Sequence, residues 1–263
     1  MLLAIDIGNT NVTLGVFRDE ELLATWRLAT DTHRLPDEYG LILLNMLPIK
    51  GVSPQDIDSI AICSVVPPLT GVFEELGNTY FNVPALVVGT GTRTGVKILY
   101  DNPRDVGADR VVDAAAAFNL YGGPVIVVDF GTATVFDAVS RDGEYLGGAI
   151  ASGIRLTAEA LYERTSQLRR VELVPPRTAI GRSTAASIQS GIVFGHVGMV
   201  EAMVRRFKAE MEEDTKVVAT GGMAPLVQSE TSIFDAVNLE LTLIGLRLIY
   251  DINTKAKAAS TEG

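Results

Sequence analysis

The sequence has few of the residues that most often bind metals or form cross-links. Its 263 residues include one cysteine, Cys63, and two histidines, His33 and His196. A single cysteine excludes a disulfide within the chain and a cysteine-based zinc site, and two histidines exclude a histidine-rich metal site. This composition favours a reducing compartment.

Long apolar stretches are also missing. No run of about twenty uncharged apolar residues occurs, which is the length needed to cross a membrane. Asp6 interrupts the apolar start before a signal-peptide pattern could form. We therefore expect a soluble, cytoplasmic protein with no membrane partner. Residues 255–263 are small and polar, and we expect them to form a flexible tail.

Positive charge is scarce. Lys and Arg number 22 against 32 Asp and Glu, so the net charge is −10 at pH 7. An acidic surface repels phosphate backbones, and we expect no nucleic-acid partner. The sequence is nonetheless 47% hydrophobic and has 25 glycines, which indicates a folded chain with many tight turns.

The sequence does contain a repeated pattern. AIDIGNTNVTLGVF near the start and VVDFGTATVFDAV further on both read as an apolar strand, Asp, one residue, Gly, and small polar residues entering a second strand. Asp6 and Asp129 lie about 123 residues apart. An internal duplication is the simplest explanation. We place the boundary at residues 121/122, near the turn residues Gly122 to Pro124, with a first domain 1–121 and a second domain 122–254.

Strand and helix patterns alternate along the chain, which predicts a mixed α/β fold. Helical spacing covers residues 37–47, 113–120, 154–167, 184–206 and 239–250. Strand patterns cover residues 2–5, 12–17, 22–27, 59–65, 85–88, 125–128, 135–139, 144–149 and 217–219. An apolar stripe within 184–206 and just beyond it is expected to pack in the core or against a second copy: Val197, Val200, Val204 and Phe207.

The two repeated turns have the composition of phosphate-binding loops. At the end of a strand, each turn places one carboxylate, small polar side chains, and backbone amides that a neighbouring glycine leaves accessible to a ligand. This combination suits a magnesium-bound polyphosphate. An ordinary polar hairpin turn explains one such loop equally well. The pairing favours the functional interpretation, since two loops can hold two ends of a triphosphate. Neither a Rossmann nor a P-loop motif occurs.

Several motifs in the same order resemble the type III pantothenate kinases of the actin, Hsp70 and sugar-kinase superfamily. They are DIGNTN at the start, SVVP at 64–67, NP at 102–103, GADR at 107–110, DFGTAT at 129–134, GG at 147–148 and TGG at 220–222. The resemblance covers essentially the whole chain. It implies two ribonuclease-H-like domains with an interdomain nucleotide cleft, and phosphorylation of pantothenate by ATP as the first step of coenzyme A biosynthesis.

The resemblance also implies roles for single residues in ATP binding. Asp129 would hold a monovalent cation, K⁺ or NH₄⁺, and Asp6 would hold Mg²⁺ directly or through water. Gly221 and Gly222 would lie against the adenosine. The implied ATP-binding residues are Asp6, Ile7, Gly8, Asn9, Thr10, Asn11, Val12, Thr13, Gly131, Thr132, Gly221 and Gly222.

The implied pantothenate site contains the catalytic base. Asp109 would accept the hydroxyl proton and Arg110 would orient the substrate, although a helix N-terminal turn with Asp109 as its cap explains the segment equally well. Tyr100 would line the pocket, and Thr184 would reach it from the second subunit of a homodimer; a helix N-cap is the alternative for Thr184. The implied substrate-binding residues are Tyr100, Gly107, Ala108, Asp109, Arg110 and Thr184.

One position departs from the family pattern, because Val135 stands where a threonine is usual after DFGTAT. We expect phosphate binding to survive this loss of a hydroxyl. Two other functions stay open on the residues alone. One is a non-catalytic accessory or regulatory protein on the same fold, which the intact Asp6, Asp109 and Asp129 disfavour. The other is a kinase of a sugar or another small alcohol.

Overall fold

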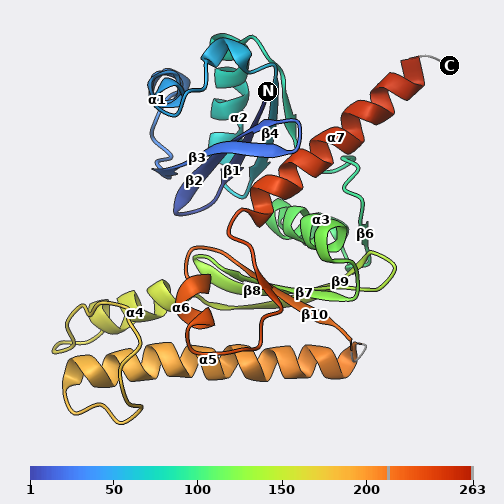
Figure 1. Cartoon of the computed structure of the whole chain (residues 1–263). Coiled ribbons are helices and arrows are strands. Elements are labelled where there is room, and N and C mark those ends of the chain that lie inside the picture. Colours follow the sequence, from blue (N-terminus) through green and yellow to red (C-terminus); the bar gives the residue numbers. More distant parts are fainter. Residues whose placement is uncertain (212–213, 262–263) are drawn as a thin grey trace. The chain divides into compact units, whose positions relative to one another are not determined.

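The computed structural model describes residues 1–211 and 214–261, with side chains to residue 255 (Figure 1). Contacts divide the chain into two compact units. The first comprises Met1–Val96, Asn102–Ala116 and the chain from Thr242 onward. The second comprises Lys97–Asp101 and Ala117–Leu241. Each unit contains one sheet.

The sheet of the first unit has five strands in the order β3-β2-β1-β4-β5. Its antiparallel part consists of β1 (Leu2–Ile7), β2 (Asn11–Arg18) and β3 (Glu21–Ala29). The strands β4 (Ser59–Ser64) and β5 (Ala85–Val87) continue it in parallel with β1. The central strand β1 is apolar on both sides, because both faces of the sheet are covered.

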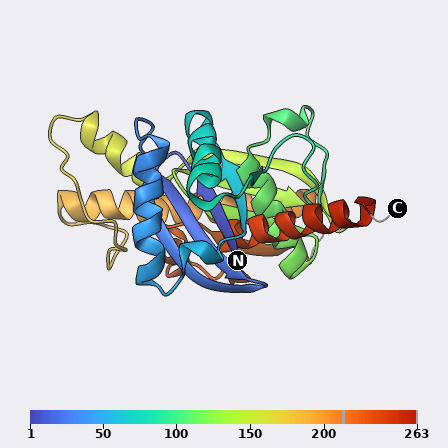
Figure 2. The ribbon, with the colours of Figure 1, turned by 90° about the horizontal axis from the view of Figure 1, so that it is seen from above.

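Helices α1 (Pro36–Ile49) and α2 (Pro67–Leu76) cover one face of this sheet (Figure 2). They pack with the alternate β1 residues Leu3, Ile5 and Ile7. The other set, Leu2 and Ala4, packs with residues of α3 (Ala108–Tyr121) and α7 (Leu241–Thr261). This alternation is the two-residue period of a strand. Short helical turns lie at η1 (Pro54–Asp56), η2 (Gly77–Phe81) and η3 (Pro103–Asp105).

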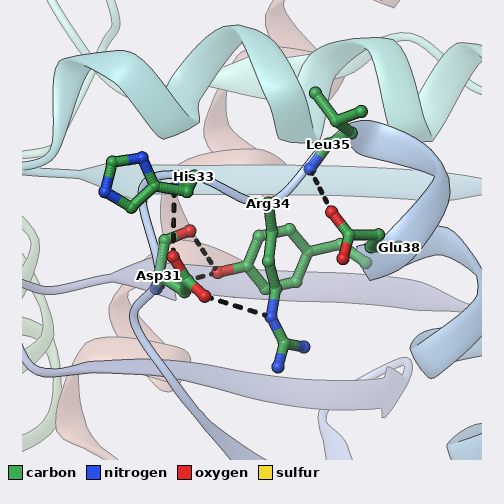
Figure 3. Close-up of polar contacts among 6 residues, drawn as sticks. Asp31, His33, Arg34, Leu35 and Glu38 are labelled. Carbon is green, nitrogen blue, oxygen red and sulfur yellow. Dashed lines mark hydrogen bonds and ion pairs between the residues drawn. The ribbon is translucent and has the colours of Figure 1, made fainter.

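A polar network fixes the chain between β3 and α1 (Figure 3). The carboxylate of Asp31 accepts the His33 amide at 3.0 Å and lies 3.5 Å from Nε of Arg34. At the start of the helix the Leu35 amide donates to Glu38 at 2.9 Å. Amides at a helix N-terminus have no partner within the helix, and the Glu38 carboxylate satisfies the one next to it.

The second sheet repeats the topology of the first. Its order is β11-β10-β7-β8-β9-β6. The hairpins β7 (Val125–Phe130), β8 (Ala133–Val139) and β9 (Glu144–Ser152) are antiparallel, and β10 (Lys216–Thr220) and β11 (Ala236–Val237) run parallel to β7. Strand β6 (Lys97–Ile98) is added beside β9. The shared strand order confirms the mixed α/β fold and the duplication predicted from the sequence.

Helices α4 (Ile154–Glu163), α5 (Thr184–Glu210) and α6 (Ala224–Gln228) belong to the second unit. The long helix α5 runs along its sheet (Figure 1). The expected stripe packs in this core: Val197, Val200 and Val204 are buried, and Phe207 contacts Phe136 at a ring distance of 5.9 Å. The core interpretation of the stripe is confirmed.

Some elements differ from the sequence-based expectation. Helix α2 was not predicted, because Pro67 and Pro68 look like breakers; they occupy its first turn, where a helix tolerates proline. Helix α4 ends at Glu163 and α7 reaches Thr261, into the segment expected to be a tail, whose residues 262–263 lie outside the described part. By contact, α7 groups with the first unit, since Leu243, Leu246 and Ile249 fill that core.

A search of the described residues for membrane-crossing segments finds no helix with the length and apolar character required.

Candidate active site

The first candidate phosphate loop connects β1 to β2. Asp6 is half-buried near the end of β1, and the amide of Gly8 donates to the Asn11 carbonyl at 3.0 Å, which closes the turn. The side chains of Ile7 and Val12 are fully buried in the core, so these two residues can offer a ligand only their backbone. The exposed side chains of the loop are those of Asn9, Thr10 and Asn11.

This loop is held by Thr30, which sequence reasoning did not identify. The Thr30 hydroxyl donates to the Gly8 carbonyl at 2.6 Å, and its amide donates to the Thr10 carbonyl at 3.0 Å. With its carbonyls bonded, the turn keeps one conformation before any ligand arrives. Thr30 lies 22 residues away in sequence, at the end of β3, so no local motif points to it.

The candidate base lies at the start of α3. Oδ1 of Asp109 accepts the Arg110 amide at 2.8 Å. A methyl group on Gly107 would lie 2.5 Å from the same oxygen, so a side chain at this position would displace the Asp109 carboxylate. Burial raises the pKa of the Asp109 carboxyl, although the amide and charge of Arg110 oppose the shift. Arg110 is buried, so it is not the solvated side chain of an ordinary helix turn.

Negative charges gather around Cys63 in the first unit. Cys63 lies opposite Asp6 in the pairing of β1 with β4. Burial raises the pKa of its thiol well above the ordinary value, and the charges of Asp6, Asp109 and Asp113 raise it further. Cys63 packs in one core cluster with Ala108 and Val112 of α3, the helix that carries Asp109 and Asp113. The predicted magnesium residue and the predicted base therefore come from two elements that meet at this thiol.

Asp113 was missed by sequence reasoning. It is 3% exposed and follows Asp109 by four residues in α3, a spacing that places two helical residues on one face. This four-residue spacing was visible in the sequence and could have identified Asp113. Within the part of the chain that the structure describes, no group of three or more His, Cys, Asp or Glu side chains is arranged to hold a metal ion.

The second candidate loop is the tip of the β7–β8 hairpin, and three predicted residues meet at it. Asp129 pairs with Val135, and Gly131 and Thr132 form the turn. A methyl group on Gly131 would lie 3.3 Å from the Asp129 carboxylate, and one on Gly221 would overlap the other oxygen of the same carboxylate. The structure thus brings the predicted cation residue and the predicted adenosine residue into contact.

A buried histidine supports this second loop. Nε2 of His196 lies 2.9 Å from the hydroxyl of Thr134, where β8 begins, and its ring lies 6.1 Å from that of Phe130. Burial lowers the pKa of His196, which favours the neutral ring. Sequence reasoning missed this contact, because His196 comes from the middle of α5.

Tyr100 belongs to the second unit, where it is half-buried after β6. The centre of its ring lies 6.2 Å from that of Tyr145. A methyl group on Gly147 would lie 3.4 Å from the Tyr100 ring. GADR belongs to the first unit.

Thr184 opens α5, but Ser183 is its N-cap, since the Ser183 hydroxyl accepts the Ala186 amide at 3.2 Å. The capping alternative for Thr184 is therefore wrong. Thr184 instead lines a mostly apolar groove of about 590 Å³. Residues of α4, the loop after it, α5 and the end of β9 form this groove, which we call the α5 groove: Ala151, Ser152, Thr157, Leu161, Leu168, Thr184, Ser187, Ile188, Gly191, Ile192, Gly195, His196 and Met199.

Comparison with known proteins identifies close relatives along nearly the whole chain. Residues 2–206 match the family model described as type III pantothenate kinase. A type III pantothenate kinase from Dehalococcoides mccartyi is 52% identical over 252 residues, covering 96% of both chains. One from Roseiflexus is 51% identical over 253 residues, covering 96% of this chain and 99% of the relative.

Solved structures support the fold. A Campylobacter jejuni protein described as a Baf family transcriptional activator aligns with a TM-score of 0.61 and 19% identity, covering 96% of this chain and 99% of that protein. The ethanolamine utilization protein EutJ from Carboxydothermus hydrogenoformans aligns with a TM-score of 0.55 and 13% identity, covering 94% and 89%. At these identities the likeness concerns the fold alone.

Proposed function

The chain belongs to the type III pantothenate kinase family, and we propose that it transfers the γ-phosphoryl group of ATP to the primary hydroxyl of pantothenate, the first step of coenzyme A biosynthesis. The observation that supports this most directly is Asp109, a carboxylate whose proton affinity is raised by burial at a partly exposed position within GADR.

Asp109 acts as the general base. It accepts the hydroxyl proton of pantothenate as the oxygen attacks the γ-phosphorus and ADP leaves. The raised pKa makes Asp109 a better acceptor than an ordinary aspartate. In a loose transition state the proton departs late, so the carboxylate also orients the nucleophile. Arg110 lies beside it and directs the substrate, and Gly107 leaves room for the carboxylate.

The two loops bind the phosphate groups of ATP. Residues 6–13 act through the amides of their turn and the exposed side chains of Asn9, Thr10 and Asn11, supported by Thr30. Gly131 and Thr132 form the second phosphate loop, supported through Thr134 and His196. Gly221 and Gly222 lie against the adenosine, where a side chain would block its approach. Val135 is part of β8 and leaves the backbone of the second loop intact.

Asp6 binds Mg²⁺, directly or through water, and Asp129 binds a monovalent cation, K⁺ or NH₄⁺. The carboxylate of Asp6 is half-buried near the end of β1, beside the turn whose exposed side chains are oxygen-bearing, and this position suits a cation bound with the phosphates. When bound, such cations neutralise charge that develops on the transferring phosphoryl group. The oxygen-rich first loop suits a hard cation such as Mg²⁺.

The active enzyme is a homodimer that shares its substrate site. Tyr100 contacts pantothenate within one subunit, and Thr184 reaches it from the second copy. The support is the α5 groove beside Thr184, whose largely apolar lining a second copy would cover.

An acceptor panel tests the proposed function. Purified protein is incubated with ATP, Mg²⁺ and K⁺ and with pantothenate, glucose or glycerol, and ADP release is measured. We expect turnover with pantothenate alone. Turnover with glucose but not pantothenate would instead favour a sugar kinase, and no turnover with any acceptor would favour a non-catalytic protein.

A further inference from the structure

The backbone next to Tyr100 is hydrogen-bonded to strand β9. The amide of Leu99 donates to the Tyr145 carbonyl at 2.9 Å, and β6 pairs with β9 just before it. An ion pair between Lys97 and Glu144, 2.8 Å long, joins the same two strands. The backbone that carries Tyr100 is therefore fixed along β9, but these bonds leave the ring free to turn.

The ring of Tyr100 rests on Tyr145. Their centroids lie 6.2 Å apart with an angle of 48° between the ring planes, within the range of favourable aromatic pairs. On the β9 side, Gly147 has a φ of +125° and only a hydrogen where other residues carry a side chain, so the Tyr100 ring can lie close to the strand. The orientation of Tyr100 thus depends on the position of the Tyr145 ring.

Tyr145 is in turn anchored by a buried carboxylate. It is fully buried, and its hydroxyl donates to Oδ1 of Asp137 at 2.7 Å. Asp137 is 2% exposed. A buried bond between a hydroxyl and a carboxylate is stronger than one between neutral groups, and it fixes the ring that carries the hydroxyl.

We propose that Tyr145 and Asp137 are positioning residues for pantothenate, because they hold the ring of Tyr100 in its binding orientation. This rests on the proposed function, in which Tyr100 contacts the substrate. Neither residue touches substrate itself. The carboxylate of Asp137 fixes Tyr145, Tyr145 fixes Tyr100, and the orientation of Tyr100 sets the affinity for pantothenate.

The test compares Tyr145→Phe with wild type. The variant keeps the ring and loses only the hydroxyl. We expect KM for pantothenate to rise by about three- to tenfold, the range of one lost hydrogen bond, with kcat and KM for ATP nearly unchanged. Asp137→Ala should behave like Tyr145→Phe, whereas Asp137→Asn keeps an acceptor oxygen and should restore most of the pantothenate affinity.

Tyr80→Phe is the matched control. Its hydroxyl also donates to an aspartate, Asp37, at 2.6 Å, but in the first unit. We expect no change in either KM. An unchanged pantothenate KM in Tyr145→Phe, or an equal rise in Tyr80→Phe, would overturn the proposal.

A second readout is independent of activity. ¹⁹F NMR of the full chain labelled with 3-fluorotyrosine reports on the Tyr100 ring, and Tyr100→Phe assigns its resonance. We expect that resonance to shift or broaden in Tyr145→Phe and to stay unchanged in Tyr80→Phe. If wild type fails to phosphorylate pantothenate, the proposed function is wrong. The Tyr100 resonance still tests whether Tyr145 positions the Tyr100 ring, and an unchanged resonance in Tyr145→Phe would overturn that proposal.

Discussion

Gly221 lies against the carboxylate of Asp129, so closely that a methyl group on Gly221 would overlap Oδ1 of that residue. Its φ of +87° is also a conformation that residues with a side chain rarely adopt. A glycine is therefore required here for two reasons, backbone conformation and space. The same contact links the loop proposed for the adenosine to the residue proposed for the monovalent cation.

Gly221→Ala should raise KM for ATP by about tenfold or more, equal to about 1.4 kcal/mol of lost binding, because the methyl group overlaps both the Asp129 carboxylate and the backbone of Phe130. Gly91→Ala is the control. Gly91 has a φ of +90° with nothing within 4 Å, so alanine there incurs the backbone cost of about 1 to 2 kcal/mol without the overlap. Equal KM values in the two variants would contradict the steric argument.

Asp109→Asn should lower kcat by about 10²- to 10⁴-fold while the dissociation constant of ATP stays nearly constant, because an amide cannot accept the hydroxyl proton. Single-turnover kinetics and a nucleotide-binding titration measure the two effects. Asp105→Asn, at an exposed carboxylate four residues earlier, is the control and should keep full activity. Retained turnover in Asp109→Asn would remove Asp109 from the role of base.

The pH dependence follows from the raised pKa of Asp109. The base must be ionised, so kcat/KM should fall as pH falls through this pKa, and the midpoint should lie above the ordinary value of 3.8. The stability effect has the opposite sign. The folded state binds this proton more tightly than the unfolded state, so the contribution of Asp109 to the free energy of unfolding decreases as pH rises from the unfolded pKa through the folded pKa.

Asp109→Asn removes that pH-dependent contribution and should be at least as stable as wild type at neutral pH. Thermal unfolding across the pH range measures this difference. A loss of stability in Asp109→Asn at neutral pH would contradict the assignment of burial as the main cause of the shift.

The repeated turns made the topology predictable. Asp6 and Asp129 each follow an apolar strand and precede a second one, and the two sheets share the strand order that this repetition indicates. The glycines of both loops could be predicted from the same repeated pattern. Strand β6, with two residues, has too short a pattern to be recognised.

The supports of the site were not predictable. Thr30 and His196 act through side chains that reach the loops, and Tyr145 through a ring that contacts Tyr100, from distant parts of the sequence. Single-sequence patterns report only local spacing. Asp113 is the exception, since its four-residue distance from Asp109 was visible.

Gly195→Arg should produce a monomer with greatly reduced turnover if a second copy covers the α5 groove. Gly195 is exposed and lines this groove, a Cβ atom there would have nothing within 4 Å, and replacing a helical glycine favours the helix. Gly71→Arg on α2, also in open space, is the control and should remain a dimer. Light scattering and turnover measure both variants, and a fully active monomer would end the shared-site proposal.

Mixing two inactive proteins sharpens this test. Asp109→Asn and Thr184→Ala subunits are denatured, mixed and refolded together. A mixed dimer contains one site with both intact residues, so turnover should return. If both residues act within one subunit, no activity would be recovered.

The phosphorylation of pantothenate is tested most directly by mass spectrometry of the product. Wild type and Asp109→Asn are incubated with pantothenate, ATP and Mg²⁺, with K⁺ or with Na⁺ alone. We expect phosphopantothenate from wild type with K⁺, much less with Na⁺, and almost none from the variant although it still binds ATP. Absence of phosphopantothenate from folded wild type with ATP, Mg²⁺ and K⁺ would contradict the proposed function.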